Sequence, residues 1–113
     1  MSIPNAIVID IKIWPEFFLG WMTGHKRAEF RKLDRNYRVG DKVRMWEWDP
    51  KKKSRPYTGR VINCEIIDIV EVDQVGGLTA AQKKAFQGYG VISMKLVSYG
   101  RRDTPPTDAK PAE

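Results

Sequence analysis

Three residues that could do chemistry lie close together in the first third of the chain: Lys26, Glu29 and Arg31. Residues two apart on a strand share a face, so Glu29 and Arg31 are expected to be neighbours, with Lys26 at the rim. An ammonium, a carboxylate and a guanidinium can together bind an anion, hydrogen-bond the edge of a base, or transfer protons. A surface salt bridge would use the same charges without a ligand, and spacing alone leaves these alternatives open.

A further candidate, Glu47, lies in the segment 42–48. Strict alternation along a strand places Glu47 on the same face as Val43 and Met45. A carboxylate among apolar side chains needs a partner, because burying an unpaired charge is costly. We therefore treat Glu47 as a candidate site residue, with a structural salt bridge as the alternative.

Positive charge is concentrated in one part of the chain. The formal net charge is +6, and residues 26–60 contain 13 Lys or Arg against 5 Asp or Glu. Each cation placed against a phosphate releases counterions, so this distribution favours RNA or a nucleotide as partner, with a solubility surplus as the alternative. The candidate nucleic-acid contacts are cations for phosphates and aromatic rings for base stacking: Lys12, Lys26, Arg31, Arg35, Arg60, Trp48 and Tyr57.

The elements that must position these residues are mainly strands. Period-two alternation and β-branched runs predict strands over residues 8–13, 28–33, 42–48, 61–72 and 89–97, the fourth being long enough to bend once. Three-to-four spacing of apolar residues predicts helices over 15–23 and 79–86, the second capped by Thr79 and ended by Gly88. Residues 49–56 form a Pro-bounded loop with four positive charges. This order predicts a β-barrel with a helix plugging one end.

Length and composition limit the domain organisation. The 113 residues suffice for one core, so residues 1–99 are expected to form a single domain. Residues 100–113 are Pro-rich and predict a disordered tail. Cys64 is the single cysteine, which excludes an intrachain disulfide and a cysteine metal cluster and fits a cytoplasmic setting. Because the sequence has no membrane-spanning apolar run and no signal peptide, we expect no membrane association. We also expect no cofactor and no metal.

The pattern Gly-x-Lys-x-x-Glu-x-Arg, formed by Gly24, Lys26, Glu29 and Arg31, resembles the signature of ASCH domains in the PUA-like superfamily. Further segments resemble a compact ASCH-like family of bacteria and phages: residues 11–18, 31–41, 46–50 and 57–60. The resemblance covers about residues 9–97. It implies an α+β, mainly β fold: a small β-barrel with one helix after the first strand and a second short helix before the last.

The resemblance also implies binding of RNA, a nucleotide or a modified nucleoside around Lys26, Glu29 and Arg31. Some ASCH proteins are amidohydrolases that deacetylate N4-acetylcytidine with a Lys, a Thr and a distant Glu. Lys26 matches that Lys, whereas Glu29 stands where the Thr would be. Other ASCH proteins are ribonucleases, and because His25 is the one imidazole here, a mechanism with two His residues is excluded.

Three hypotheses follow. In the first, the domain is a binding module whose cations hold phosphates while Glu29 contacts donor groups of a base. In the second, it is a hydrolase in which Lys26 is the nucleophile or general base and Glu29 or Glu47 transfers protons. In the third, the basic face binds another protein.

Overall fold

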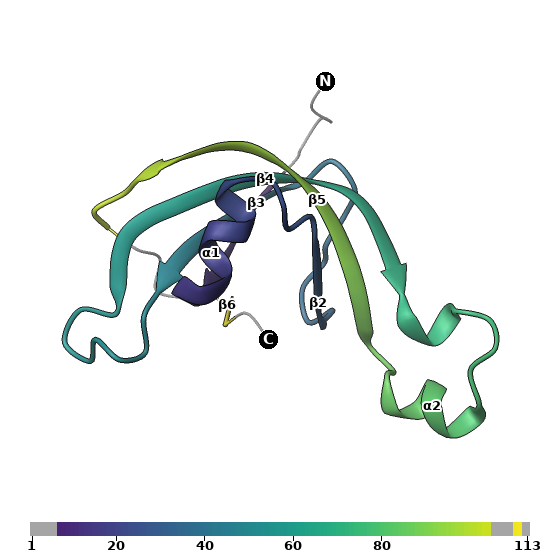
Figure 1. Cartoon of the computed structure of the whole chain (residues 1–113). Helices are drawn as coiled ribbons and strands as arrows, with labels where there is room; N and C mark the ends of the chain where they lie inside the picture. Colours follow the sequence, from purple (N-terminus) through teal and green to yellow (C-terminus); the bar gives the residue numbers. More distant parts are fainter. Residues whose placement is uncertain (1–6, 105–109, 112–113) are drawn as a thin grey trace.

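Strands are the main regular elements in this computed structural model, which describes residues 7–104 and 110–111 (Figure 1). The strands are β1 (Val8–Ile13), β2 (Ala28–Lys32), β3 (Lys42–Trp48), β4 (Tyr57–Glu71), β5 (Tyr89–Arg101) and β6 (Lys110–Pro111). The helical segments are α1 (Pro15–Met22), the 3-10 turn η1 (Val72–Gln74) and α2 (Ala80–Ala85).

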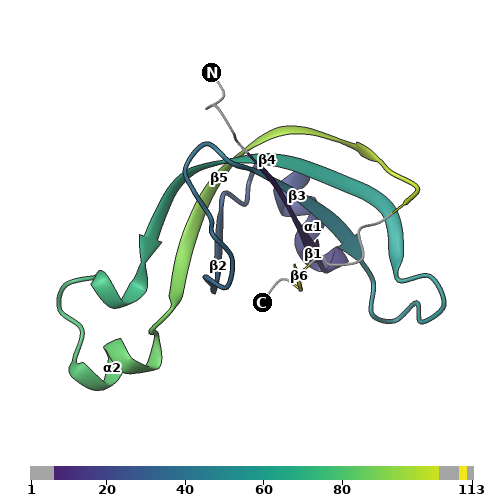
Figure 2. The same cartoon turned by 180° about the vertical axis from the view of Figure 1, so that it is seen from behind.

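All of these strands belong to one sheet with the order β2-β5-β4-β3-β1-β6. The neighbours from β2 to β3 are antiparallel, whereas β1 runs parallel to β3 and β6 runs parallel to β1. The sheet arches into a half-barrel with α1 under the arch, and β4 and β5 extend as an arm toward α2 (Figures 1 and 2). Register shifts near Cys64 and Ile66 let the long β4 bend along this arch.

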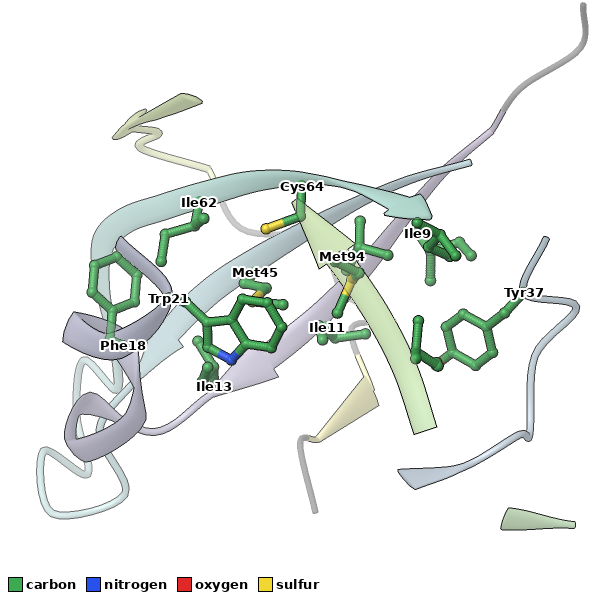
Figure 3. Packing of buried hydrophobic residues seen from close by; sticks show 13 residues of the cluster. Ile9, Ile11, Ile13, Phe18, Trp21, Tyr37, Met45, Ile62, Cys64 and Met94 are labelled. Carbon is green, nitrogen blue, oxygen red and sulfur yellow. The ribbon is translucent and has the colours of Figure 1, made fainter. Parts of the chain in front are cut away.

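The hydrophobic core fills the space between the concave face of the sheet and α1 (Figure 3). Ile9, Ile11 and Ile13 alternate along β1 toward this face, and Phe18 and Trp21 reach it from α1, three residues apart. The other strands contribute Met45, Ile62, Cys64 and Met94. Because Phe18 and Trp21 are both buried, α1 is fixed against the sheet, and so is the turn that leads from it into β2.

The predicted fold class is confirmed: an α+β, mainly β half-barrel with a helix after the first strand and a short helix before the long strand β5. Strands β1 and β3 have the predicted bounds, and Thr79 caps α2 in a capping box with Gln82. Cys64 is a buried strand residue, and burial raises the pKa of its thiol to about 12.

Two strands are longer than the sequence patterns predicted. Strand β4 begins at Tyr57 and β5 ends at Arg101, because these segments pair with each other, with Arg60 opposite Arg101. Residues 100 and 101, predicted to begin a disordered tail, therefore belong to a strand, and Lys110–Pro111 form β6. Residues 105–109 and 112–113 of that predicted tail lie outside the described residues.

Candidate functional site

Strand β2 carries charged residues on the face that is normally apolar. Glu29 and Arg31 point to the concave side and are only 4% and 2% exposed, whereas Phe30 between them is 44% exposed. Apolar side chains are the usual occupants of a buried strand face, and charged ones are found there when they are paired or functional. As predicted, Glu29 and Arg31 are on the same face of the strand, and this face lies inside the half-barrel.

Lys26 reaches this pair from the turn between α1 and β2. Gly24, with a φ of +79°, makes the turn possible, and the backbone N–H of Lys26 donates to the carbonyl of Gly20 at 2.8 Å. The Lys26 Nζ lies 3.9 Å from Glu29 Oε1 and 5.7 Å from the centre of the Trp21 ring. The ammonium therefore lies between the end of α1 and the buried carboxylate.

Tyr37, in the loop after β2, completes this group. Its ring centre lies 6.0 Å from the guanidinium carbon of Arg31, and within residues 7–104 and 110–111 its hydroxyl makes no hydrogen bond. Burial raises the pKa of the Tyr37 phenol, with the charge of Arg31 opposing the rise, so the group stays a neutral O–H at physiological pH. We call Lys26, Glu29, Arg31 and Tyr37 the inner site.

A cavity of about 240 Å³ opens beside the inner site. Three cations line it: Lys26, Arg27 and Lys95. Apolar atoms of Ile67 and Met94 form part of its wall. A cavity with several cations and an apolar wall suits a ligand that has both an anionic group and a flat apolar part.

Glu47, on β3, is another buried carboxylate, and its neighbours bind it. Arg60 donates from Nε and Nη2 to its two oxygens at 2.8 and 2.7 Å, and the Thr58 hydroxyl donates at 2.5 Å. Burial alone would raise the pKa of Glu47, but the hydrogen bonds from Arg60 and Thr58 outweigh it and lower the pKa. The predicted burial of Glu47 is confirmed, and its partner is Arg60.

The aromatic residues predicted to stack on a base lie on the outer face of the sheet. Lys12 alternates with the buried isoleucines of β1 and therefore points outward, with its Nζ 4.9 Å from the Trp48 ring centre and 6.0 Å from that of Tyr57. Trp46, next to Tyr57, donates from Nε1 to Asp10 at 2.7 Å. A cation thus lies over the Trp48 and Tyr57 rings, and a base that stacks on the same face of Trp48 has to displace Lys12.

The predicted site residues thus form three groups. Lys26, Glu29 and Arg31 are together. Arg35 is in the loop that carries Tyr37, and its carbonyl accepts a hydrogen bond from Tyr37 N at 2.9 Å. Glu47 and Arg60 form a pair, and the outer group is Lys12, Trp48 and Tyr57. Sequence reasoning missed Tyr37, because the loop that carries it has no periodic pattern; the one available signal was its place in the ASCH-like segment 31–41.

Within residues 7–104 and 110–111, no three His, Cys, Asp or Glu side chains are grouped so that they could hold a metal ion. Neither of the α-helices there has the length and apolar content needed to cross a membrane.

Comparison with protein families and curated proteins gives two matches. The family model described as "Domain of unknown function (DUF3850)" matches residues 8–94. A relative from Escherichia phage P2, the "Uncharacterized 12.9 kDa protein in GpA 3'region", is 36% identical over 67 residues, 59% of this chain. The chain spans 58% of the length of that relative.

Solved structures give the fold. The crystal structure of one mutant form of the ZmASCH protein from Zymomonas mobilis has a TM-score of 0.53 and 18% identity, covering 93% of this chain and 87% of that one. The crystal structure of a second ZmASCH mutant protein gives the same TM-score of 0.53 at 17% identity, with 88% and 86% covered. The half-barrel is therefore an ASCH-like fold.

Proposed function

Because the chain belongs to the DUF3850 family of domains of unknown function, its role must be inferred from its site, and we propose that this ASCH-like domain binds RNA or a nucleotide through Lys26, Glu29 and Arg31. One observation carries the proposal: the inner face of β2 holds a buried carboxylate and a buried guanidinium while Phe30 points outward. Replacing buried ionic groups with apolar ones of similar volume is often neutral or stabilising, so the fold alone does not require them.

The chemistry of the inner site fits a nucleoside. A carboxylate accepts hydrogen bonds from the exocyclic amino group of cytosine, and a guanidinium donates to base carbonyls and ring nitrogens. Glu29 and Arg31 supply these two functions, and the neutral hydroxyl of Tyr37 adds a donor. The cations around the adjacent cavity, Lys26 among them, provide a place for phosphate.

Two variants, each of which removes one positive charge, test the proposal. Lys26→Met removes a cation of the inner site, while Lys32→Met removes one from the exposed outer side of β2. We expect Lys26→Met to weaken binding of cytidine monophosphate at low salt by at least about tenfold, because hydrogen bonds to charged groups contribute about 1.5 to 3 kcal/mol. Lys32→Met should change it by less than about twofold, as judged by calorimetry on folded samples.

Equal affinity for the nucleotide in wild type and Lys26→Met would refute the proposed site. Circular dichroism melting curves of both variants show whether they are folded, so that lost binding cannot be mistaken for lost structure. A loss of the same size in both variants would point to general charge rather than to the inner site.

A second candidate function is hydrolysis of an N4-acylated cytidine, favoured by the 3.9 Å separation of Lys26 Nζ and Glu29 Oε1. Water would add to the acyl carbon as Glu29 takes its proton, the C–N bond would break, and the proton would pass to the amine, releasing a carboxylic acid and cytidine. Chromatography of N4-acetylcytidine incubated with wild type and Glu29→Gln tests this. Release of cytidine by both proteins alike, or by neither, would exclude Glu29 as the base. In a separate test, single-stranded RNA that stays intact on a gel after incubation with the protein would exclude ribonuclease activity.

A further inference from the structure

One end of the half-barrel collects positive charge from two segments that are distant in the sequence. The start of β4 lies next to the end of β5, as the register of Arg60 with Arg101 requires, and the β3–β4 loop is on the same side of the molecule (Figures 1 and 2). All the cations of this end are exposed: Lys51, Lys52, Lys53, Arg55, Arg60, Arg101 and Arg102. The acidic residues within these segments are Asp49 and Asp103. We call these seven cations the basic end.

Two of these cations face each other in a way that stability alone would disfavour. Arg60 and Arg101 are directly paired on neighbouring antiparallel strands, where like charges are destabilising. Each guanidinium is nevertheless held in place. Arg60 is fixed by Glu47, and Arg101 donates from Nη2 to the carbonyl of Thr58 at 3.0 Å.

The backbone at Gly59 makes room for this arrangement. Gly59 has a φ of +94°, and a Cβ there would come within 2.9 Å of Arg101 Nη2. Guanidinium groups that are already ordered lose less side-chain entropy when an anion binds. An anion that bridges Arg60 and Arg101 would also remove their mutual repulsion.

The basic end and the inner site lie at different positions along strand β5. Ala28, at the start of β2, pairs with Ser93, and Arg101 lies eight residues further along β5. This distance corresponds to roughly 26 Å of strand. Seven exposed cations are more than one phosphate can contact, whereas a chain of several nucleotides can contact them and also reach the inner site.

We infer that the basic end binds the phosphodiester backbone of a single-stranded polynucleotide, one nucleoside of which occupies the inner site. The inference rests on the proposed function and narrows its ligand from a free nucleotide to a strand. A single strand fits because a base must leave its stack to be contacted on its edge inside the half-barrel.

The test compares two double variants with equal loss of charge. Lys52→Gln/Lys53→Gln neutralises two exposed lysines of the basic end, and Lys83→Gln/Lys84→Gln neutralises two on α2, at the opposite end of the arm. The ligands are a labelled RNA of about 12 nucleotides, within the range that small single-strand-binding folds cover, and cytidine monophosphate. Affinities are measured by fluorescence anisotropy and calorimetry over a range of salt concentrations.

For Lys52→Gln/Lys53→Gln we expect weaker RNA binding and a salt slope smaller by about 1.4, since each phosphate contact on a single strand contributes about 0.7. Affinity for cytidine monophosphate should not change, and Lys83→Gln/Lys84→Gln should match wild type with both ligands. Identical RNA affinity and salt slope in the two double variants would overturn the inference while leaving the proposed function intact.

Two other results are distinguishable. If the Lys26→Met variant binds the RNA as wild type does while Lys52→Gln/Lys53→Gln binds it more weakly, the inner site is refuted and the basic end is supported. A wild-type protein that prefers a duplex of the same sequence would overturn the single-strand assignment.

Discussion

Glu47 on β3 and Glu29 on β2 are both buried, and their ion pairs differ. Glu47 is 2% exposed and receives hydrogen bonds of 2.5 to 2.8 Å from Thr58 and Arg60. Glu29 is 4% exposed, and its ammonium neighbour Lys26 stays 3.9 Å away. The two carboxylates are thus similarly buried, but the ion pair of Glu47 with Arg60 is shorter than that of Glu29 with Lys26.

The difference separates two uses of a buried charge. A carboxylate whose oxygens are bound at short distance by an arginine contributes to the fold and fixes the position of its partner, here Arg60 of the basic end. A carboxylate in a longer ion pair beside a neutral phenol and a cavity can rearrange its contacts when a ligand enters. We expect Glu47 to act on stability and Glu29 to act on binding.

Replacing Glu47 should have the largest effect. Glu47→Leu leaves the Arg60 guanidinium without its anion, and we expect a loss of about 2 to 3 kcal/mol in the free energy of unfolding. This is less than for a fully buried pair, because the Arg60 side chain is 46% exposed and can reach water. Urea denaturation measures the loss, with Glu65→Gln as the control, because Glu65 is partly exposed and pairs with Lys42 and Lys95. A loss below about 0.5 kcal/mol would mean that Glu47 is not structural.

Glu29→Gln should affect binding more than stability. The amide keeps the shape but presents an N–H₂ group where a base amino group would donate, so we expect about tenfold weaker binding of cytidine monophosphate. The free energy of unfolding should change by less than in Glu47→Leu, because the amide has the same shape and can still form hydrogen bonds. Calorimetry gives the affinity, and Glu71→Gln, on the exposed arm, is the matched control. Unchanged affinity in Glu29→Gln would contradict the assigned role.

Acid should weaken the fold partly through Glu47. The pKa of Glu47 is lowered from its ordinary value of 4.5, so its ionised form stabilises the folded state above that value, and the contribution is lost as the pH falls through the lowered pKa. The difference in unfolding free energy between wild type and Glu47→Leu should therefore shrink between about pH 6 and pH 3. A constant difference across this range would rule out a charged Glu47 as the source. Asp41, whose pKa is also lowered, titrates alike in both proteins.

The smallest effect expected is the coupling within the inner site itself. A double-mutant cycle of Lys26→Met and Glu29→Gln should give a coupling to stability below about 1 kcal/mol, because the two charged groups are 3.9 Å apart. The corresponding cycle of Arg60→Met and Glu47→Gln should exceed about 1 kcal/mol. Equal couplings would remove the contrast between the two carboxylates.

Local patterns accounted for much of the fold. The alternation in residues 8–13 and 42–48 predicted β1 and β3, and spacing alone placed Glu29 and Arg31 on one face. The ends of β4 and β5 were missed because they depend on each other: residues around Gly59 and Gly100 show no alternation and become strands only by pairing.

The parts of the site that could not be predicted depend on long-range packing. The parity of Glu47 predicted its burial, but its partner follows from the register of β3 with β4, which pairs Trp46 with Val61 and so brings the next residues, Glu47 and Arg60, together. Likewise, Lys12 lies over the Trp48 ring because β1 pairs beside β3, a neighbour that no local pattern specifies. For this reason, aromatic residues proposed as stacking surfaces have an intramolecular cation over them.

The parallel pairing of β1 with β3 has a consequence for folding. Val8 pairs with Lys42, so a long segment that contains α1 and β2 must close as one loop, whereas β3 and β4 are joined by a short hairpin. Contacts between distant residues form slowly, so docking of β1 is expected to follow formation of the hairpin. The inner site lies on the segment enclosed by this loop. The capacity to bind should therefore appear only when the chain is fully folded, and recovery of ligand binding and of tryptophan fluorescence during refolding should coincide.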